Sequence, residues 1–179
     1  MDSNFKEGKG WANLAVWAVS TLALVLADQY TKILAVIHLK DKAPFVIWDG
    51  VFELLYSENR GAAFGMLQGK QGFFFVIGLA VLAGAVYVMW KMPGWKASRY
   101  HALKLCVILI TAGALGNMVD RVSQGFVVDF LYFKLIHFPI FNVADIYVTV
   151  AAAALFLLIC FYYKDEELEI FRLKKEEKF

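Results

Sequence analysis

The chain has 179 residues, of which 60% are hydrophobic and 19% are charged, and its formal net charge is +2. A soluble domain carries about 25% charged residues, and here the apolar residues are gathered into long runs. The composition therefore excludes an ordinary soluble protein, and no basic cluster points to a nucleic-acid partner.

Four apolar runs are long enough to cross a bilayer, which takes about 20 helical residues. They are approximately 11–35, 73–92, 103–119 and 143–163. The first run also resembles a secretory signal peptide, because Lys6 and Lys9 precede it and Val25-Leu26-Ala27 resembles a cleavage site. It is longer than a usual signal core, so we interpret it as a retained membrane anchor.

The short connection after the second run predicts the orientation in the membrane. It carries Lys91, Lys96, Arg99 and Lys104 and no acidic residue, and such loops stay in the cytoplasm. Both termini then face the cytoplasm as well, including the mixed Glu and Lys tail at 164–179, which we expect to be a solvated helix or a frayed end. The segments 40–72 and 121–142 then face outward.

The first outward segment is too long for a simple connector and predicts a small β-sheet. Phe45–Trp48 and Val51–Tyr56 have the composition of short strands, and Asp49-Gly50 between them is a good hairpin turn. Ala62–Leu67 is a possible extension of this sheet. The second outward segment is mostly apolar, and Phe126–His137 within it predicts a strand or a helix at the membrane interface.

Four acidic residues are attached to the apolar runs, where a charge is costly and is usually functional. The topology brings all four to the outward end of the spans, which predicts a shared polar site. They are Asp28, Asp120, Asp129 and Asp145.

Asp129 and Asp145 are separated by Pro139 and cannot share one helix face, but an out-and-back segment can bring them together. Two carboxyls in a partly dry site hold one proton between them, which is the acid–base chemistry of aspartic proteases. Asp120 and Arg121 are open to two interpretations, a helix-end ion pair or a direct role with substrate. The spacing of Asp28 and Lys32 suits helical i,i+4 pairing.

Five sequence boxes in this order resemble the signature of lipoprotein signal peptidase, also called signal peptidase II. They are Asp28-Gln29-Tyr30-Thr31-Lys32, the box from Asn59 to Gly65, Gly116-Asn117-Met118-Val119-Asp120-Arg121, Val127-Val128-Asp129-Phe130 and Phe141-Asn142-Val143-Ala144-Asp145. The resemblance covers most of the chain. It implies an all-α polytopic membrane protein with four transmembrane helices, a small outward β-cradle and an interfacial segment that corresponds to the family's periplasmic helix.

The resemblance also implies roles for single residues. Asp129 and Asp145 become the catalytic dyad of an intramembrane aspartyl endopeptidase in the bacterial inner membrane. The substrate groove is expected to contain Asn59, Gly61, Asn117, Arg121 and Asn142, and the supporting framework Asp28, Lys32 and Asp120.

The substrate implied by the resemblance is a prolipoprotein, cut before a cysteine that carries diacylglycerol. Membrane lipids and globomycin-type inhibitors are the other expected partners, and no metal or cofactor is expected. One departure is that many members have Ser where this chain has Ile146. Apolar contacts for the acyl chains are expected from Phe64, Phe126, Phe130, Phe133 and Phe141.

Other membrane peptidase chemistries lack their residues here, because His38, His101 and His137 form no His-Glu-x-x-His motif. The alternative from another class is a subunit of a proton-coupled transporter or channel, which also uses intramembrane acids. A transporter needs acidic residues along the depth of the membrane, whereas these four acidic residues lie at one end.

Cys106 and Cys160 are interpreted as packing residues. We expect the chain to form one domain and to be a monomer.

Overall fold

The computed structural model describes residues 3–61 and 71–171. Four long helices form a bundle: α1 (Ser3–Leu39), α2 (Gln71–Lys91), α3 (His101–Gln124) and α4 (Val143–Leu157), which continues into the π-helix η4 (Leu158–Tyr162). All four contain stretches long and apolar enough to cross a membrane. The four predicted spans are therefore confirmed as apolar helices, and the chain is a multi-pass membrane protein.

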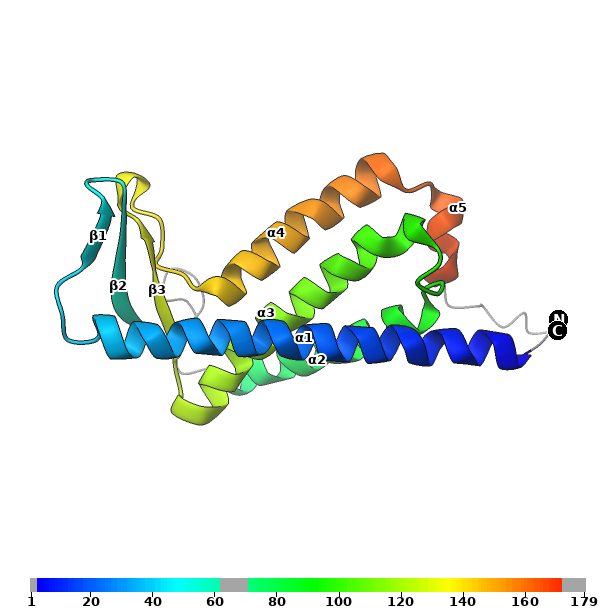
Figure 1. Cartoon of the computed structure of the whole chain (residues 1–179), viewed down its shortest axis with the longest axis horizontal. Coiled ribbons are helices and arrows are strands. Elements are labelled where there is room, and N and C mark those ends of the chain that lie inside the picture. The colour runs from blue at the N-terminus through cyan, green and yellow to red at the C-terminus, as the bar shows by residue number, and fades with distance from the viewer. Residues whose placement is uncertain (1–2, 62–70, 172–179) are drawn as a thin grey trace.

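A three-stranded antiparallel sheet in the order β1-β2-β3 closes one end of the bundle, called here the sheet end (Figure 1). It consists of β1 (Phe45–Trp48), β2 (Phe52–Asn59) and β3 (Val127–Phe133). The hairpin turn at Asp49-Gly50 is as predicted, since Gly50 has a φ of 69°. The possible strand Ala62–Leu67 falls outside the described residues.

The second outward segment begins later than predicted. α3 continues to Gln124, beyond the predicted end at 119, and stops where Gly125 adopts a φ of 81° and donates to the Arg121 carbonyl. Phe126–His137 was predicted to be a strand or a helix, and it contains strand β3 followed by the short 3₁₀-helix η3 (Lys134–Ile136), so the strand alternative is confirmed. The helix that the resemblance implied for the second outward segment is limited to η3 and the last turn of α3. β3 is a strand because β2 supplies its antiparallel partner. This partner is distant in the sequence, so the residues of 126–137 alone could not decide between strand and helix.

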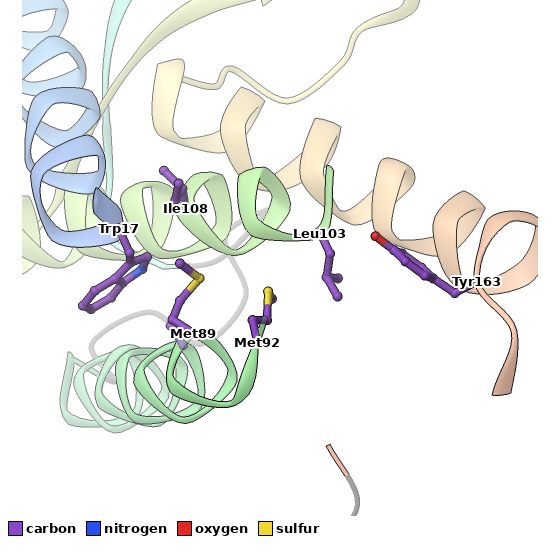
Figure 2. Packing of buried hydrophobic residues seen from close by; sticks show 7 residues of the cluster. Trp17, Met89, Met92, Leu103, Ile108 and Tyr163 are labelled. Carbon is purple, nitrogen blue, oxygen red and sulfur yellow. The ribbon is translucent and has the colours of Figure 1, made fainter. Parts of the chain in front are cut away.

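The opposite end, called the distal end, contains the α2–α3 connection with η2 (Ser98–Tyr100), and the C-terminal elements α5 (Asp165–Leu168) and η5 (Glu169–Phe171). A buried cluster fills this half of the bundle, and Figure 2 shows its members on α1, on α3, on α2 and directly after it, and at Tyr163 directly after η4. Its buried members are Trp17, Ala85, Met89, Met92, Leu103, Ile108 and Tyr163.

Side chains from α1 and α3 cap the C-terminal end of α2, whose last carbonyls lack helical partners. The Asn13 amide donates to the carbonyls of Met89 and Met92 at 3.1 and 2.9 Å. The Lys104 ammonium donates to the Pro93 carbonyl at 2.7 Å. Lys104 is fully buried on α3. The predicted orientation counted it among the residues of the cytoplasmic loop, and this is corrected.

Cys106 is buried as expected, whereas Cys160 is exposed, so its interpretation as a packing residue is wrong.

α3 approaches α4 closely at a glycine. A Cβ built on Gly113 would lie 2.5 Å from both the Ala144 carbonyl oxygen and Val148 Cγ2. Gly84 on α2 has nothing within 4 Å of its corresponding position.

We expect Gly113→Ala to destabilise the protein by about 1–3 kcal/mol, because overpacking forces the two helices apart. Gly84→Ala is the matched control and should be neutral or slightly stabilising, since alanine favours helix. Thermal unfolding in detergent, followed by tryptophan fluorescence, measures both. Equal melting temperatures for the two variants would contradict the close contact between α3 and α4.

Candidate active site

A cavity of about 890 Å³ lies between α2 and α4, with α3 at its back and the sheet at its end. The cavity is lined by both predicted catalytic residues, Asp129 and Asp145. Three of the five predicted groove residues also line it, namely Asn59, Asn117 and Arg121. Gly61 and Asn142 are not among the lining residues, but each is hydrogen-bonded to one of them, Gly61 to Asn59 and Asn142 to Asp129. Phe133 and Phe141 also line the cavity. Phe126 and Phe130 pack into a second cluster beneath the sheet, and Phe64 falls outside the described residues.

Asn142 joins the two predicted catalytic aspartates. Its amide nitrogen donates to Asp129 Oδ1 at 2.6 Å, and its backbone N–H donates to Asp145 Oδ2 at 3.1 Å. Its side-chain oxygen accepts from the Asp145 N–H at 3.0 Å. Asn142 and Asp145 thus form the capping box of α4, so the structure that begins the helix also orients both carboxyls.

The remaining carboxylate oxygens accept hydrogen bonds from two more asparagines. The Asn59 amide, at the end of β2, donates to Asp129 Oδ2 at 2.9 Å. The Asn117 amide, on α3, donates to Asp145 Oδ1 at 2.8 Å. Each carboxyl is therefore fixed by donors from two different elements, which leaves little freedom for either to rotate.

The pKa of Asp129 is raised to about 6, mainly by burial and to a smaller extent by the charge of Asp145. The hydrogen bonds from Asn59 and Asn142 oppose this shift, because they stabilise the ionised form. Asp129 is 2% exposed, so the desolvation of its carboxyl is nearly complete. A proton is therefore held at this pair at a pH where an ordinary carboxyl has lost it.

A buried ionic cluster lies behind the two aspartates, and we call Asp28, Lys32 and Asp120 the triad. The Lys32 ammonium is 2.8 Å from Asp28 Oδ2 and 3.0 Å from Asp120 Oδ2, and all three side chains are at most 4% exposed. The pairing of Asp28 with Lys32 is as predicted. The ion-pair interpretation of Asp120 and Arg121 is wrong, because Asp120 pairs with Lys32.

The triad holds the backbone next to each candidate catalytic residue. Asp28 Oδ1 accepts from the N–H of Ala144 at 2.9 Å, and Asp120 Oδ2 accepts from the N–H of Val128 at 3.2 Å. These residues immediately precede Asp145 and Asp129. The Lys32 ammonium also donates to Asn117 Oδ1 at 2.9 Å, which orients the amide that binds Asp145.

Arg121 enters the cavity from α3 without a carboxylate partner among the described residues. Its guanidinium donates to the Gly61 carbonyl at 3.1 Å and to the Asn117 carbonyl at 3.4 Å. It lies 4.2 Å from the centre of the Phe74 ring. Within the part of the chain that the structure describes, these two hydrogen bonds leave most of its five donors without an acceptor, so it can still bind an incoming carbonyl.

Some site residues were missed by the sequence analysis. Gln29 donates to Asp120 Oδ1 at 2.9 Å and thereby completes the triad. Its position inside the Asp28–Lys32 box was the available signal. Ser57 pairs with Asp129 across the β2–β3 ladder and lines the cavity, but a lone serine in a strand gives no signal. Among the described residues, no group of three His, Cys, Asp or Glu side chains could hold a metal ion.

Comparison with known proteins finds one family model, described as signal peptidase II, that matches residues 20–161. Several lipoprotein signal peptidases are similar over most of their length. That of Clostridioides difficile is 38% identical over 79% of this chain and 92% of the relative, and that of Caldanaerobacter subterraneus is 43% identical over 77% and 91%. A solved bacterial membrane enzyme structure matches with a TM-score of 0.70, 30% identity and coverage of 92% and 94%.

We expect Lys32→Met to destabilise the protein by about 3–5 kcal/mol, because it leaves two buried carboxylates without a cation. The triple variant Asp28→Asn, Lys32→Met, Asp120→Asn should recover part of this loss. Lys40→Met, at an exposed pair with Glu58 of 3.9 Å, serves as the control and should change little. Thermal unfolding in detergent measures all three, and a Lys32→Met variant as stable as the wild type would contradict the role of the triad.

Proposed function

The chain belongs to the signal peptidase II family of membrane proteases, and we propose that it removes the signal peptide from bacterial prolipoproteins. Cleavage occurs before the diacylglyceryl-modified cysteine. The observation that carries the proposal is the pair Asp129 and Asp145, joined through Asn142 at the wall of a cavity between two membrane-spanning helices. The comparisons give no support to a transporter, and the acids gather at one end of the bundle.

The proposed chemistry is that of an aspartic protease. One carboxyl of the dyad is protonated and donates to the scissile carbonyl, while the ionised one takes a proton from the attacking water. The carboxyl that took the proton from water then passes it to the cysteine nitrogen as the C–N bond breaks, while a hydroxyl of the tetrahedral intermediate returns a proton to the other carboxyl, so the dyad regains its starting state with one proton. The raised pKa of Asp129, about 6, makes it the candidate for the protonated member.

Other residues would orient the substrate. The unused donors of Arg121 are available to the peptide carbonyls, and Asn59 and Asn117 hold the two carboxyls. The apolar walls of the cavity, including Phe74 and Ile146, would contact the acyl chains. Ile146 at the position where many members have Ser adds an apolar side chain to this wall.

The proposed orientation has the sheet end outside and both termini in the cytoplasm. It is supported by Lys91, Lys96 and Arg99 at the distal end. In this orientation the dyad lies near the outer headgroups, where a diacylglyceryl anchor would hold the scissile bond.

We expect Asp129→Asn and Asp145→Asn to reduce cleavage of a diacylglyceryl-modified prolipoprotein by about 10²–10⁴-fold or more, because each removes a group that transfers a proton. Purified protein in lipid nanodiscs and a gel-shift assay measure this. Thr149→Ala, on the same cavity wall, is the control and should retain most activity. If folded wild type leaves the substrate intact, or if both Asn variants cleave it, the proposal fails and proton flux becomes the next assay.

The pH dependence should report the dyad. Because the pKa of Asp129 is raised, its proton is present below about 6 and is lost as the pH rises through that value, so kcat/KM should decline above it. Asn59→Ala removes a bond that stabilises ionised Asp129 and should shift the declining limb to higher pH. Lys134→Ala, in η3 and paired with Glu53, should leave the limb unchanged. A shift to lower pH in Asn59→Ala would contradict the assignment.

A further inference from the structure

The C-terminal segment Tyr163–Phe171 follows α4 and lies beyond the residues matched by the family, which end at 161. At Tyr163 the chain leaves the helix in an extended conformation and then forms α5 and η5. Figure 1 shows α5 turning back from the end of α4 toward the α2–α3 connection. The prediction for this tail was a solvated helix or a frayed end. Residues 165–168 do form a short helix that begins with exposed residues, but the segment 164–171 is docked on the bundle and is not frayed.

Arg99 of the α2–α3 connection holds this segment. Its guanidinium donates to both carboxylate oxygens of Glu167, at 2.8 and 3.0 Å, and to the Tyr162 carbonyl. It also lies 3.8 Å from the centre of the Tyr162 ring and 5.5 Å from that of Tyr163. An exposed ion pair alone contributes little, but a two-pronged pair stacked on aromatic rings is stronger and more directional.

Further hydrogen bonds join the segment to the same connection. Tyr100 donates to the Glu167 carbonyl at 3.1 Å, and Tyr163 donates to the Arg99 carbonyl at 2.8 Å. The Arg99 hydrogen bonds lower the pKa of Glu167 to about 2, so the pair stays ionised at neutral pH.

The far end of the segment reaches α2. The Tyr87 hydroxyl donates to the Phe171 carbonyl at 3.3 Å. Leu168 and Phe171 pack against the distal cluster, which includes Ala85 and Met89 of α2. The segment therefore spans from the end of α4 to α2, two helices that otherwise meet mainly through α3.

The same two helices form the walls of the catalytic cavity. Phe74 and Ile77 line it from α2, and Ile146 and Val150 line it from α4. Farther from the sheet, Leu82 of α2 and Leu155 of α4 belong to the distal cluster together with Leu168 and Phe171. A connection between α2 and α4 at the distal end therefore limits how far their facing sides can separate.

We propose that the C-terminal segment sets the separation of α2 and α4, and that Arg99 and Glu167 thereby determine which signal peptides fit between them. This inference rests on the proposed function, because the occupant of the space is the apolar part of the signal peptide. With the pair intact, peptides with slim apolar side chains are admitted and bulky aromatic ones are rejected. Neither residue touches the dyad, so the pair acts on binding and not on the chemical step.

The first measurement is the distance between α2 and α4 in the full-length protein. Spin labels on Cys160 and on Ala83→Cys, in a Cys106→Ala background, report it by pulsed electron resonance, because both labelled positions are exposed. We expect one narrow distance in this background and a longer, broader distribution after Arg99→Ala or Glu167→Ala. The matched controls are Lys96→Ala and Glu166→Ala, neighbours with exposed side chains, which should keep the narrow distribution.

The second measurement compares two prolipoproteins whose signal peptides carry either Leu and Ala or Phe and Trp in the apolar segment. The unlabelled protein should prefer the slim peptide by about tenfold or more in kcat/KM, the scale of apolar size discrimination. Arg99→Ala and Glu167→Ala should bring the ratio close to one, mainly through KM, and the controls should not.

Each outcome has a distinct meaning. An unchanged distance in both Arg99→Ala and Glu167→Ala overturns the bracing role, and a changed distance with an unchanged ratio overturns the role in specificity. A loss in kcat at unchanged KM also overturns it, since that would indicate a distorted dyad. If the wild type cleaves neither substrate, the proposed function has failed, while the distance measurement still tests the brace. If Arg99→Ala does not fold, Glu167→Ala carries the test.

Discussion

A lysine ammonium buried between two carboxylates is the interaction on which the rest of the site depends. Lys32 neutralises part of the charge of Asp28 and Asp120, and the oxygens of these carboxylates then accept the N–H groups of Ala144 and Val128. A buried carboxylate without a cation would be strongly disfavoured. The ammonium therefore makes it possible for α1 and α3 to position the backbone on either side of the cavity.

This arrangement demands close approach of helices as well as charge balance. A Cβ at Gly116 would lie 2.6 Å from Asp28 Oδ2, so α3 carries no side chain where the triad passes it. Gly113, one turn earlier, gives the same freedom to α4. The ionic cluster and the two glycines therefore act together: the glycines let α3 approach α1 and α4 closely, and the ammonium balances the carboxylates that meet there.

The sequence was sufficient for the features that depend on local pattern. Long apolar runs predicted the four helices, Asp49-Gly50 predicted the hairpin turn, and i,i+4 spacing predicted the contact of Asp28 with Lys32. It was insufficient where a contact depends on which helix lies alongside. Asp120 forms its ion pair with Lys32 of α1 and not with its neighbour Arg121. Strand β3 forms because β2 is its antiparallel partner. The docking of Glu167 depends on a loop 68 residues away in sequence.

The capping box at the start of α4 gives the proposed chemistry a mechanical side. Asp145, which the proposed mechanism makes a proton-transfer group, is also the acidic residue that accepts the Asn142 N–H and faces the positive end of the α4 dipole. When Asp145 takes a proton from water, it loses charge and becomes a poorer cap. The first turn of α4 is then weakest in the interval before the peptide bond breaks, and it regains strength when the proton leaves. Turnover would thus be accompanied by a periodic loosening of the helix end that forms one wall of the cavity, timed by the reaction itself.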